Sequence, residues 1–276
     1  MKLVARVLRH PEGVTGLAII LLLVVAALFA PLVAPGDPLQ IVGRPLLTPF
    51  DAMHHLLGTD RLGRDVLVGL LYGARTSLAV GLVAALAAVV WGLIIGLVAG
   101  FAGGLIDDIL MRITDAFQIV PAFLLALAFV STLGTSLPVI IFAIALGSWA
   151  DPARLARAQV LSIRESDYVA AARVIGMHPI EIALRQILPG AVSPVLSLSA
   201  VVVASAILTE SALSFLGLGN PNLATWGTMI AEGRSVLRSA PFLSILPGMA
   251  LVITVVGVHL LSEGLAKALG FERRFR

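Results

Sequence analysis

Six long apolar stretches constrain this chain more than any other feature of its sequence. They span residues 14–34, 77–102, 111–132, 137–156, 191–216 and 242–264. Each is long enough to cross about 30 Å of hydrocarbon as a helix of about 20 residues. Charged residues make up only 13% of the chain, whereas soluble domains contain about 25%. Because the alternating segments of a membrane β-barrel are absent, the sequence predicts an all-α integral membrane protein with six transmembrane helices.

The distribution of basic residues predicts how these helices are oriented. If the N-terminus lies inside, thirteen of the nineteen lysines and arginines fall in inner segments. The six in outer segments are Arg44, Arg61, Arg64, Arg75, Arg234 and Arg238. Cytoplasmic loops of membrane proteins contain an excess of these residues, so both termini are expected in the cytoplasm. No basic run is interleaved with aromatic residues, so nucleic-acid binding is not expected.

The first apolar stretch is expected to remain as a membrane anchor. It is longer than the roughly 7 to 15 residues of the apolar core of a cleaved signal peptide. The outer loop that follows is expected to contain one interfacial helix over residues 63–74. We therefore divide the chain into a cytoplasmic N-terminus, a first helix with its outer loop, and a core of five helices, at residues 1–13, 14–75 and 76–276.

Small residues recur at every fourth position of the second stretch. They are Ala84, Ala88, Gly92, Gly96 and Gly100. Such a row lets another helix backbone approach closely in a membrane, and the partner can lie within the chain or on another subunit. Further along, Pro121 is expected near the end of a span or at a kink. The fourth stretch is expected to kink or restart at Asp151 and Pro152, because Asp can cap a helix and Pro can open one.

The fifth stretch contains polar residues at membrane depth, namely Ser205, Thr209 and Glu210. A charged residue there costs about 2.5–3.5 kcal/mol on insertion scales, so Glu210 is expected to face protein or water. These three residues are candidates for the translocation pathway. In the alternative interpretation, Glu210 is hydrogen-bonded to the turn at 214–219. Downstream, Trp226 fits an aromatic anchor at the membrane interface.

The segment from Asp167 to Pro189 is predicted to form two short helices in the cytoplasm. Asp167 can cap the first helix and Gly176 can end it in the left-handed conformation. Pro179 suits the first position of the second helix, and Glu181 and Arg185 are spaced as an ion pair on its polar face. The residues expected on its apolar face are Ile180, Ala183, Leu184, Ile187 and Leu188.

The chain lacks the motifs of several enzymes and of nucleotide binding. Neither of its two lysines, Lys2 and Lys267, follows the glycine spacing of a phosphate-binding loop. No metalloprotease or serine-hydrolase motif is present, and the adjacent residues His54 and His55 do not face the same way on a helix. We expect no catalytic residue, no metal and no bound cofactor. An ion-coupled carrier stays the main alternative to an ATP-driven transporter, and an intramembrane protease using His259 stays a minor one.

The cytoplasmic segment resembles the EAA loop of ABC-importer permeases. Residues 170–172 occupy the E-A-A positions, Gly176 the glycine position and residues 188–189 the Leu-Pro ending. Three more stretches match in order, at residues 57–65, 71–75 and 214–234. Together they are similar to the C-type permease of the dipeptide, oligopeptide and nickel importer family. The family pattern has an acid at the position of Ala170, and it usually has Ile or His at the position of Gln186.

The resemblance implies the type I ABC importer permease fold, with a cytoplasmic coupling loop at 163–189 that docks on a separate ATPase. The residues implied in docking are Tyr168, Ala170, Ala171, Ala172, Gly176, Met177, His178, Pro179, Glu181 and Arg185. The implied partners are a homologous second permease, two ATPase subunits that bind ATP and Mg²⁺, an extracytoplasmic substrate-binding protein and the lipid bilayer. The implied location is the inner membrane of a prokaryote. Peptides are the expected cargo, with nickel chelates, glutathione-like compounds and sugars left open.

Overall fold

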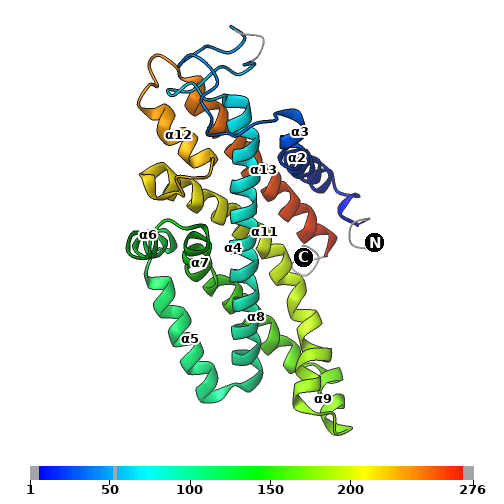
Figure 1. Cartoon of the computed structure of the whole chain (residues 1–276). Helices are drawn as coiled ribbons and strands as arrows, with labels where there is room; N and C mark the ends of the chain where they lie inside the picture. Colours follow the sequence, from blue (N-terminus) through cyan, green and yellow to red (C-terminus); the bar gives the residue numbers. More distant parts are fainter. Residues whose placement is uncertain (1–5, 52–54, 270–276) are drawn as a thin grey trace.

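The computed structural model describes residues 6–51 and 55–269, which are almost entirely helical (Figure 1). Four helical units in these ranges are long and apolar enough to cross a membrane. They are α2 (Pro11–Leu28), α4 (Val66–Ala102), the composite unit Pro179–Leu218 and α13 (Phe242–Ala268). Two bent helix pairs raise the number to as many as six. The predicted all-α membrane fold is confirmed.

Each of the bent pairs corresponds to one predicted span, and a break was expected in both. α5 (Gly104–Ile119) and α6 (Ala122–Leu133) meet at 82°, and α7 (Leu137–Ser148) and α8 (Ala150–Arg164) meet at 44°. The first bend lies at Pro121, as predicted, because proline cannot donate the hydrogen bond that would continue α5. The second lies just before the predicted restart.

Asp151 does not cap the helix that restarts there. α8 begins after Trp149, and Asp151 lies in its first turn. The carboxylate of Asp151 instead accepts a hydrogen bond of 2.6 Å from the Gln118 side chain in α5. The prediction of a break was therefore right, and the prediction of the capping residue was wrong, because the carboxylate is used between helices.

The long helix α4 lies at the centre of the molecule (Figure 1). Asp65 caps it by accepting hydrogen bonds from the backbone N–H groups of Leu67 and Val68, at 2.8 and 3.1 Å. Helix α4 continues without interruption across the predicted division between residues 75 and 76. The separate interfacial helix expected at 63–74 is not formed, because residues 66–74 belong to the first turns of α4 and residues 63–65 precede it.

The row of small residues in α4 faces another helix of the same chain. A Cβ atom on Gly96 would lie 2.4 Å from the Ala153 carbonyl oxygen in α8. One on Gly92 would lie 2.6 Å from the Trp149 carbonyl oxygen. No side chain fits at these distances, so glycine permits the backbones of α4 and α8 to touch. The structure thus places the partner of this row inside the chain.

The first and last long helices pack together in the same way. A Cβ atom on Gly16 of α2 would lie 2.3 Å from the Leu261 amide nitrogen of α13. Lys267 of α13 donates a hydrogen bond of 2.8 Å to Glu12 of α2. A short helix, α3 (Ala30–Val33), follows α2. The N-terminal part of α2 and the C-terminal part of α13 therefore lie side by side.

The fifth predicted span is part of a longer helical unit than expected. It consists of α10 (Pro179–Glu181), the π-helical turn η1 (Ile182–Ile187), α11 (Leu188–Leu213) and the π-helical turn η2 (Ser214–Leu218). The second cytoplasmic helix and the fifth span are therefore one element. Two helices outside the spans complete the fold, α9 (Asp167–Val174) and α12 (Trp226–Arg234), and they lie at opposite ends of the molecule (Figure 1).

Candidate functional site

The predicted coupling loop begins with a helix that is capped differently from the prediction. Ser166 is the residue before α9, and its backbone carbonyl accepts from the N–H groups of Val169 and Ala170. Asp167 is therefore the first helical residue and not the cap. Ala170 is the fourth residue, one position beyond the place where a glutamate would complete a capping box. An acid at position 170, where the family pattern has one, would therefore not complete a capping box in this helix.

The end of α9 agrees with the prediction. Gly176 has φ +79°, in the left-handed region. The Met177 N–H donates to the Ala172 carbonyl at 3.1 Å, and the Gly176 N–H donates to the Arg173 carbonyl at 3.0 Å. These two hydrogen bonds form a Schellman motif, which requires the left-handed residue. A Cβ atom at Gly176 would have no neighbour within 4 Å, so the requirement at this position is one of backbone conformation alone.

The elbow after Gly176 leads into α10 and the π-helical turn η1. His178 accepts a hydrogen bond from the Ile180 N–H at 3.4 Å, and Pro179 opens the helix as predicted. Arg185 donates to Glu181, which confirms the predicted ion pair.

The apolar face predicted for this helix is only partly correct. Ala183 and Ile187 are buried as expected, but Ile180 is 61% exposed and Leu184 51% exposed. Ile182, which the prediction did not place on the apolar face, is buried instead. The prediction assumed 3.6 residues per turn, and the π-helical hydrogen bonds of η1 widen the turn and rotate the following side chains.

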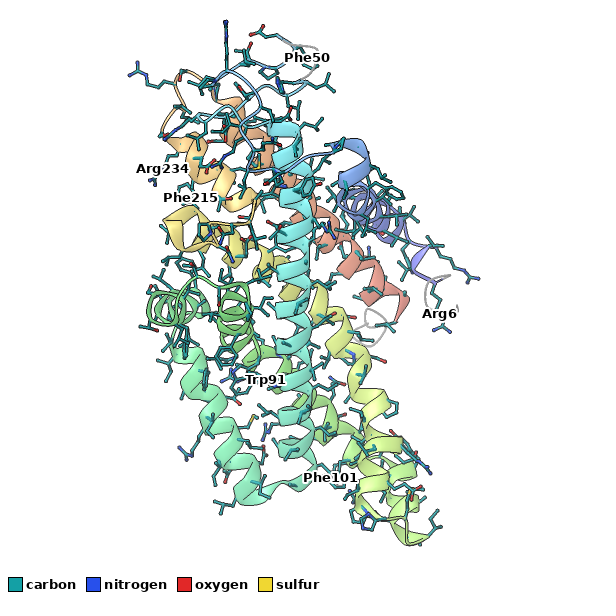
Figure 2. The ribbon with its side chains drawn as sticks, viewed as in Figure 1. Arg6, Phe50, Trp91, Phe101, Phe215 and Arg234 are labelled. Atoms are coloured by element: carbon teal, nitrogen blue, oxygen red, sulfur yellow. The ribbon has the colours of Figure 1, made fainter. Side chains whose placement is uncertain are left out.

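The inner side of the coupling loop has a small hydrophobic core. The buried members of this core are Val160, Val169, Ala172, Ile182, Ile187 and Ala191. They come from α8, α9, η1 and α11. Arg164 of α8 also donates to the carbonyl oxygens of Gly100 and Phe101, at 3.1 and 3.3 Å, and Figure 2 shows Phe101 at the end of α4 near the loop. The loop is thus fixed to the ends of three long helices.

The surface of the coupling loop that faces away from this core presents exposed apolar residues. Val174 is 87% exposed and Ile175 is 77% exposed. Tyr168 is half exposed, as are Ile180 and Leu184. The family pattern does not include Val174 and Ile175, although both directly precede its glycine.

The structure separates the predicted docking residues by exposure. Those exposed are Tyr168, Ala170, Ala171, Gly176, His178, Pro179 and Arg185. Met177 and Glu181 are half-buried, and Ala172 is buried in the core of the loop. Ala172 therefore packs inside the loop, whereas the exposed residues lie where a partner can reach them.

Glu210 lies in a buried polar cluster between α11, α4 and η2. Its side chain is almost fully buried, with 2% of the residue exposed. It accepts hydrogen bonds from the hydroxyl groups of Ser214 at 2.7 Å, Ser77 at 3.3 Å and Ser211 at 3.4 Å. Ser77 in turn accepts from the Trp226 N–H at 3.3 Å, which joins α12 to the cluster. Glu210 thus faces protein, and it is bonded to the turn that follows it, as the alternative interpretation held.

The other two pathway candidates do not join this cluster. Ser205 is exposed and Thr209 is half-buried, whereas Glu210 is buried. Their role in a pathway stays a prediction.

Trp226 is not the interfacial anchor predicted from the sequence. It is 1% exposed, and its ring N–H donates to the Leu70 carbonyl of α4 at 3.0 Å.

One of the two adjacent histidines has a defined partner. The Nδ1 atom of His55 lies 2.8 Å from a carboxylate oxygen of Asp65, the residue that caps α4. His54 lies outside the described residues.

Comparison with known protein families gives two matches. Residues 92–274 match the family described as binding-protein-dependent transport system inner membrane component. Residues 3–58 match the N-terminal transmembrane domain of oligopeptide transport permease C.

Individual relatives match over nearly the whole chain. A probable peptide ABC transporter permease protein of Sinorhizobium fredii is 43% identical, over 93% of this chain and 88% of its own length. The di/tripeptide transport system permease protein of Pseudomonas aeruginosa is 39% identical, over 94% and 88%. A glutathione transport system permease protein of Shigella flexneri is 38% identical, over 95% and 86%.

A crystal structure of an amino acid ABC transporter with histidines has the same fold. It superimposes with a TM-score of 0.54 at 21% identity, covering 75% of this chain and 94% of that one.

Proposed function

This chain belongs to the family of binding-protein-dependent transport system inner membrane components, and on that premise we propose that it forms half of a translocation pathway for peptides. It is a membrane permease subunit of an ABC importer and is not itself catalytic. The family implies that an ATPase and a substrate-binding protein work with it. The names of the relatives favour peptides as the cargo, since two are named for peptide transport and the third for glutathione, itself a small peptide.

The observation that best supports coupling to an ATPase is the exposed apolar end of α9. Val174 and Ile175 are among the most exposed large apolar residues of the described chain, yet the loop beneath them has its own core. Exposed apolar patches on an ordered element are typical of protein contact sites. We therefore place the docking surface at Val174, Ile175, Tyr168 and the turn around Gly176, on the cytoplasmic side.

The finer assembly follows from the same premise. The chain pairs with a homologous permease and with two ATPase subunits, which hold ATP and Mg²⁺. Both termini and the coupling loop lie in the cytoplasm of a prokaryote, in line with the excess of Lys and Arg in those segments. The outer loops then receive cargo from the binding protein.

Purification of the complex in mild detergent tests this assignment. We expect an ATPase subunit and the second permease to co-purify with the chain, and peptide uptake into proteoliposomes to require ATP. Uptake driven by an ion gradient in the absence of any ATPase would instead establish the alternative of an ion-coupled carrier. Mass spectrometry of the ligand bound to the partner binding protein identifies the cargo.

Replacing Gly176 with valine is expected to uncouple ATP hydrolysis from transport. A left-handed conformation costs a residue with a side chain about 1–2 kcal/mol, and the cost is greatest for β-branched residues. The Schellman motif should open and displace the exposed end of α9. We expect ATPase activity to persist while uptake per ATP falls at least fivefold in proteoliposomes.

Gly176→Asn is the matched control, because asparagine tolerates the left-handed conformation and no neighbour limits its side chain. It should retain most of the coupling. If both variants transport as well as the wild type for each ATP hydrolysed, the role of this turn in coupling is refuted.

A further inference from the structure

A pocket of about 310 Å³ opens at the end of the molecule opposite the coupling loop. Its walls come from the segments before α4 and α12, from the first turns of α4, from α12 and from the start of α13. The charged residues on its lining are Asp60, Arg61, Arg64, Asp65 and Glu232. The apolar part of the lining includes Val66, Leu223, Met229 and Leu243. Nothing in the coupling mechanism uses this pocket.

Arg64 has an unused hydrogen-bond donor in the pocket. Among the described residues, its buried Nε–H has no acceptor. The nearest oxygen of Asp60 lies 3.9 Å from Nε, and the other oxygen of Asp60 already accepts from the backbone N–H groups of Leu62 and Arg64. Leaving a buried donor without an acceptor costs free energy. A ligand oxygen that accepted from this N–H would remove that cost.

The contact between Arg64 and Glu232 is too long to satisfy the guanidinium. The Nη1 atom lies 3.4 Å from the Glu232 carboxylate. The Glu232 side chain is 46% exposed, and burial of its inner part raises its pKa even though Arg64 lies close to it. A carboxylate that met Nε and a terminal nitrogen together would form the bidentate geometry that arginine favours.

The size and lining of the pocket indicate a small ligand with both a carboxylate and an apolar group. A volume of about 310 Å³ is at the lower limit for small-molecule sites, about 300–1,000 Å³. It holds one or two amino-acid residues and no folded segment. Met229 and Leu223 offer apolar surface on the same lining as Arg64.

We propose that this pocket binds the C-terminal residue of a small peptide, with Arg64 holding the carboxylate and the apolar wall holding the side chain. The identification of the ligand as a peptide rests on the proposed function. The carboxylate site itself rests on the geometry around Arg64. The positions of Arg61 and Arg64 in an outer segment place the pocket on the side from which a binding protein delivers cargo.

Isothermal titration of the complete transport complex in nanodiscs, without its binding protein, tests the proposal. The probe is leucyl-leucine, and the comparison is the same dipeptide with its C-terminal carboxyl converted to an amide. We expect the acid to bind at least tenfold more tightly than the amide. Arg64→Gln should remove this preference, and Glu232→Gln should strengthen binding of the acid, because it removes the competing carboxylate. A merely structural role for these residues does not predict that gain.

Arg234→Gln is the matched control for the loss of one outer positive charge. Arg234 lies over the Phe215 ring at 5.1 Å from its centre (Figure 2) and is not part of the pocket lining. This variant should keep the preference for the acid.

Equal binding of acid and amide, or no binding of either, overturns the proposal, and so does an Arg64→Gln variant that still prefers the acid. If Arg64→Gln instead loses only the stimulation of ATPase activity by the binding protein, Arg64 contacts that protein and the peptide site is refuted. Peptide uptake measured on the same complex separates failure of the carboxylate site from failure of the proposed function. Uptake can persist when the carboxylate site is refuted, whereas a complex that takes up no peptide contradicts the proposed function.

Discussion

Replacing Gly96 with alanine is expected to destabilise the permease by about 1–3 kcal/mol, the usual cost of overpacking. The new Cβ would lie 2.4 Å from the Ala153 carbonyl oxygen and 2.6 Å from the Ala156 Cβ. Both atoms belong to α8 and cannot move aside without separating α8 from α4. We expect the midpoint of thermal unfolding in detergent to fall by roughly 5 °C and the yield of assembled complex to fall with it.

Gly248→Ala in α13 is the matched control for this prediction. A Cβ atom there would have no neighbour within 4 Å. Alanine is favoured over glycine in a helix by up to about 1 kcal/mol, so this variant should be as stable as the wild type or slightly more so. Unfolding of Gly96→Ala at the wild-type temperature would contradict the close contact between α4 and α8.

Replacing Glu210 with alanine is expected to cost about 3 kcal/mol or more. The change removes a buried side chain and leaves a cavity, which for large apolar residues costs about 2–5 kcal/mol. It also leaves the hydroxyl groups of Ser77 and Ser214 without their acceptor, at about 1–3 kcal/mol for a buried group. Because Ser77 also accepts from the Trp226 N–H, the attachment of α12 to α4 should weaken as well. Thermal unfolding of the purified complex measures the loss.

Two further variants distinguish a structural role of Glu210 from a role in the pathway. Glu210→Gln keeps the shape and one acceptor oxygen, so it should recover much of the stability. Ser205→Ala changes an exposed hydroxyl on the same helix and should leave stability unchanged. If Glu210→Ala is as stable as Ser205→Ala but does not transport, Glu210 acts in the pathway and the structural role is refuted.

The coupling loop shows how far local reasoning extends. The left-handed Gly176 and the helix start at Pro179 were predictable, because each depends on the conformations open to a single residue. The exposure of Leu184 was not, because it lies in the π-helical turn η1, which changes the period on which the predicted face depended. The residue types at 182–187 do not predict a π-helical turn. Ser166, and not Asp167, is the residue before α9, although its hydroxyl donates to the Ile163 carbonyl and does not cap the helix.

The sequence by itself determined three properties of the chain. It is a helical membrane protein, its helices break at Pro121, and one face of α4 allows close packing. These properties depend on hydropathy and on backbone conformations, which each residue brings with it. Only the tertiary structure decided the bends of 82° and 44°, the choice of α8 as the partner of the small residues, and the burial of Trp226. It also brought Arg64 to Glu232, 168 residues away in sequence. Such contacts depend on how all the helices pack at once, and no local pattern encodes them.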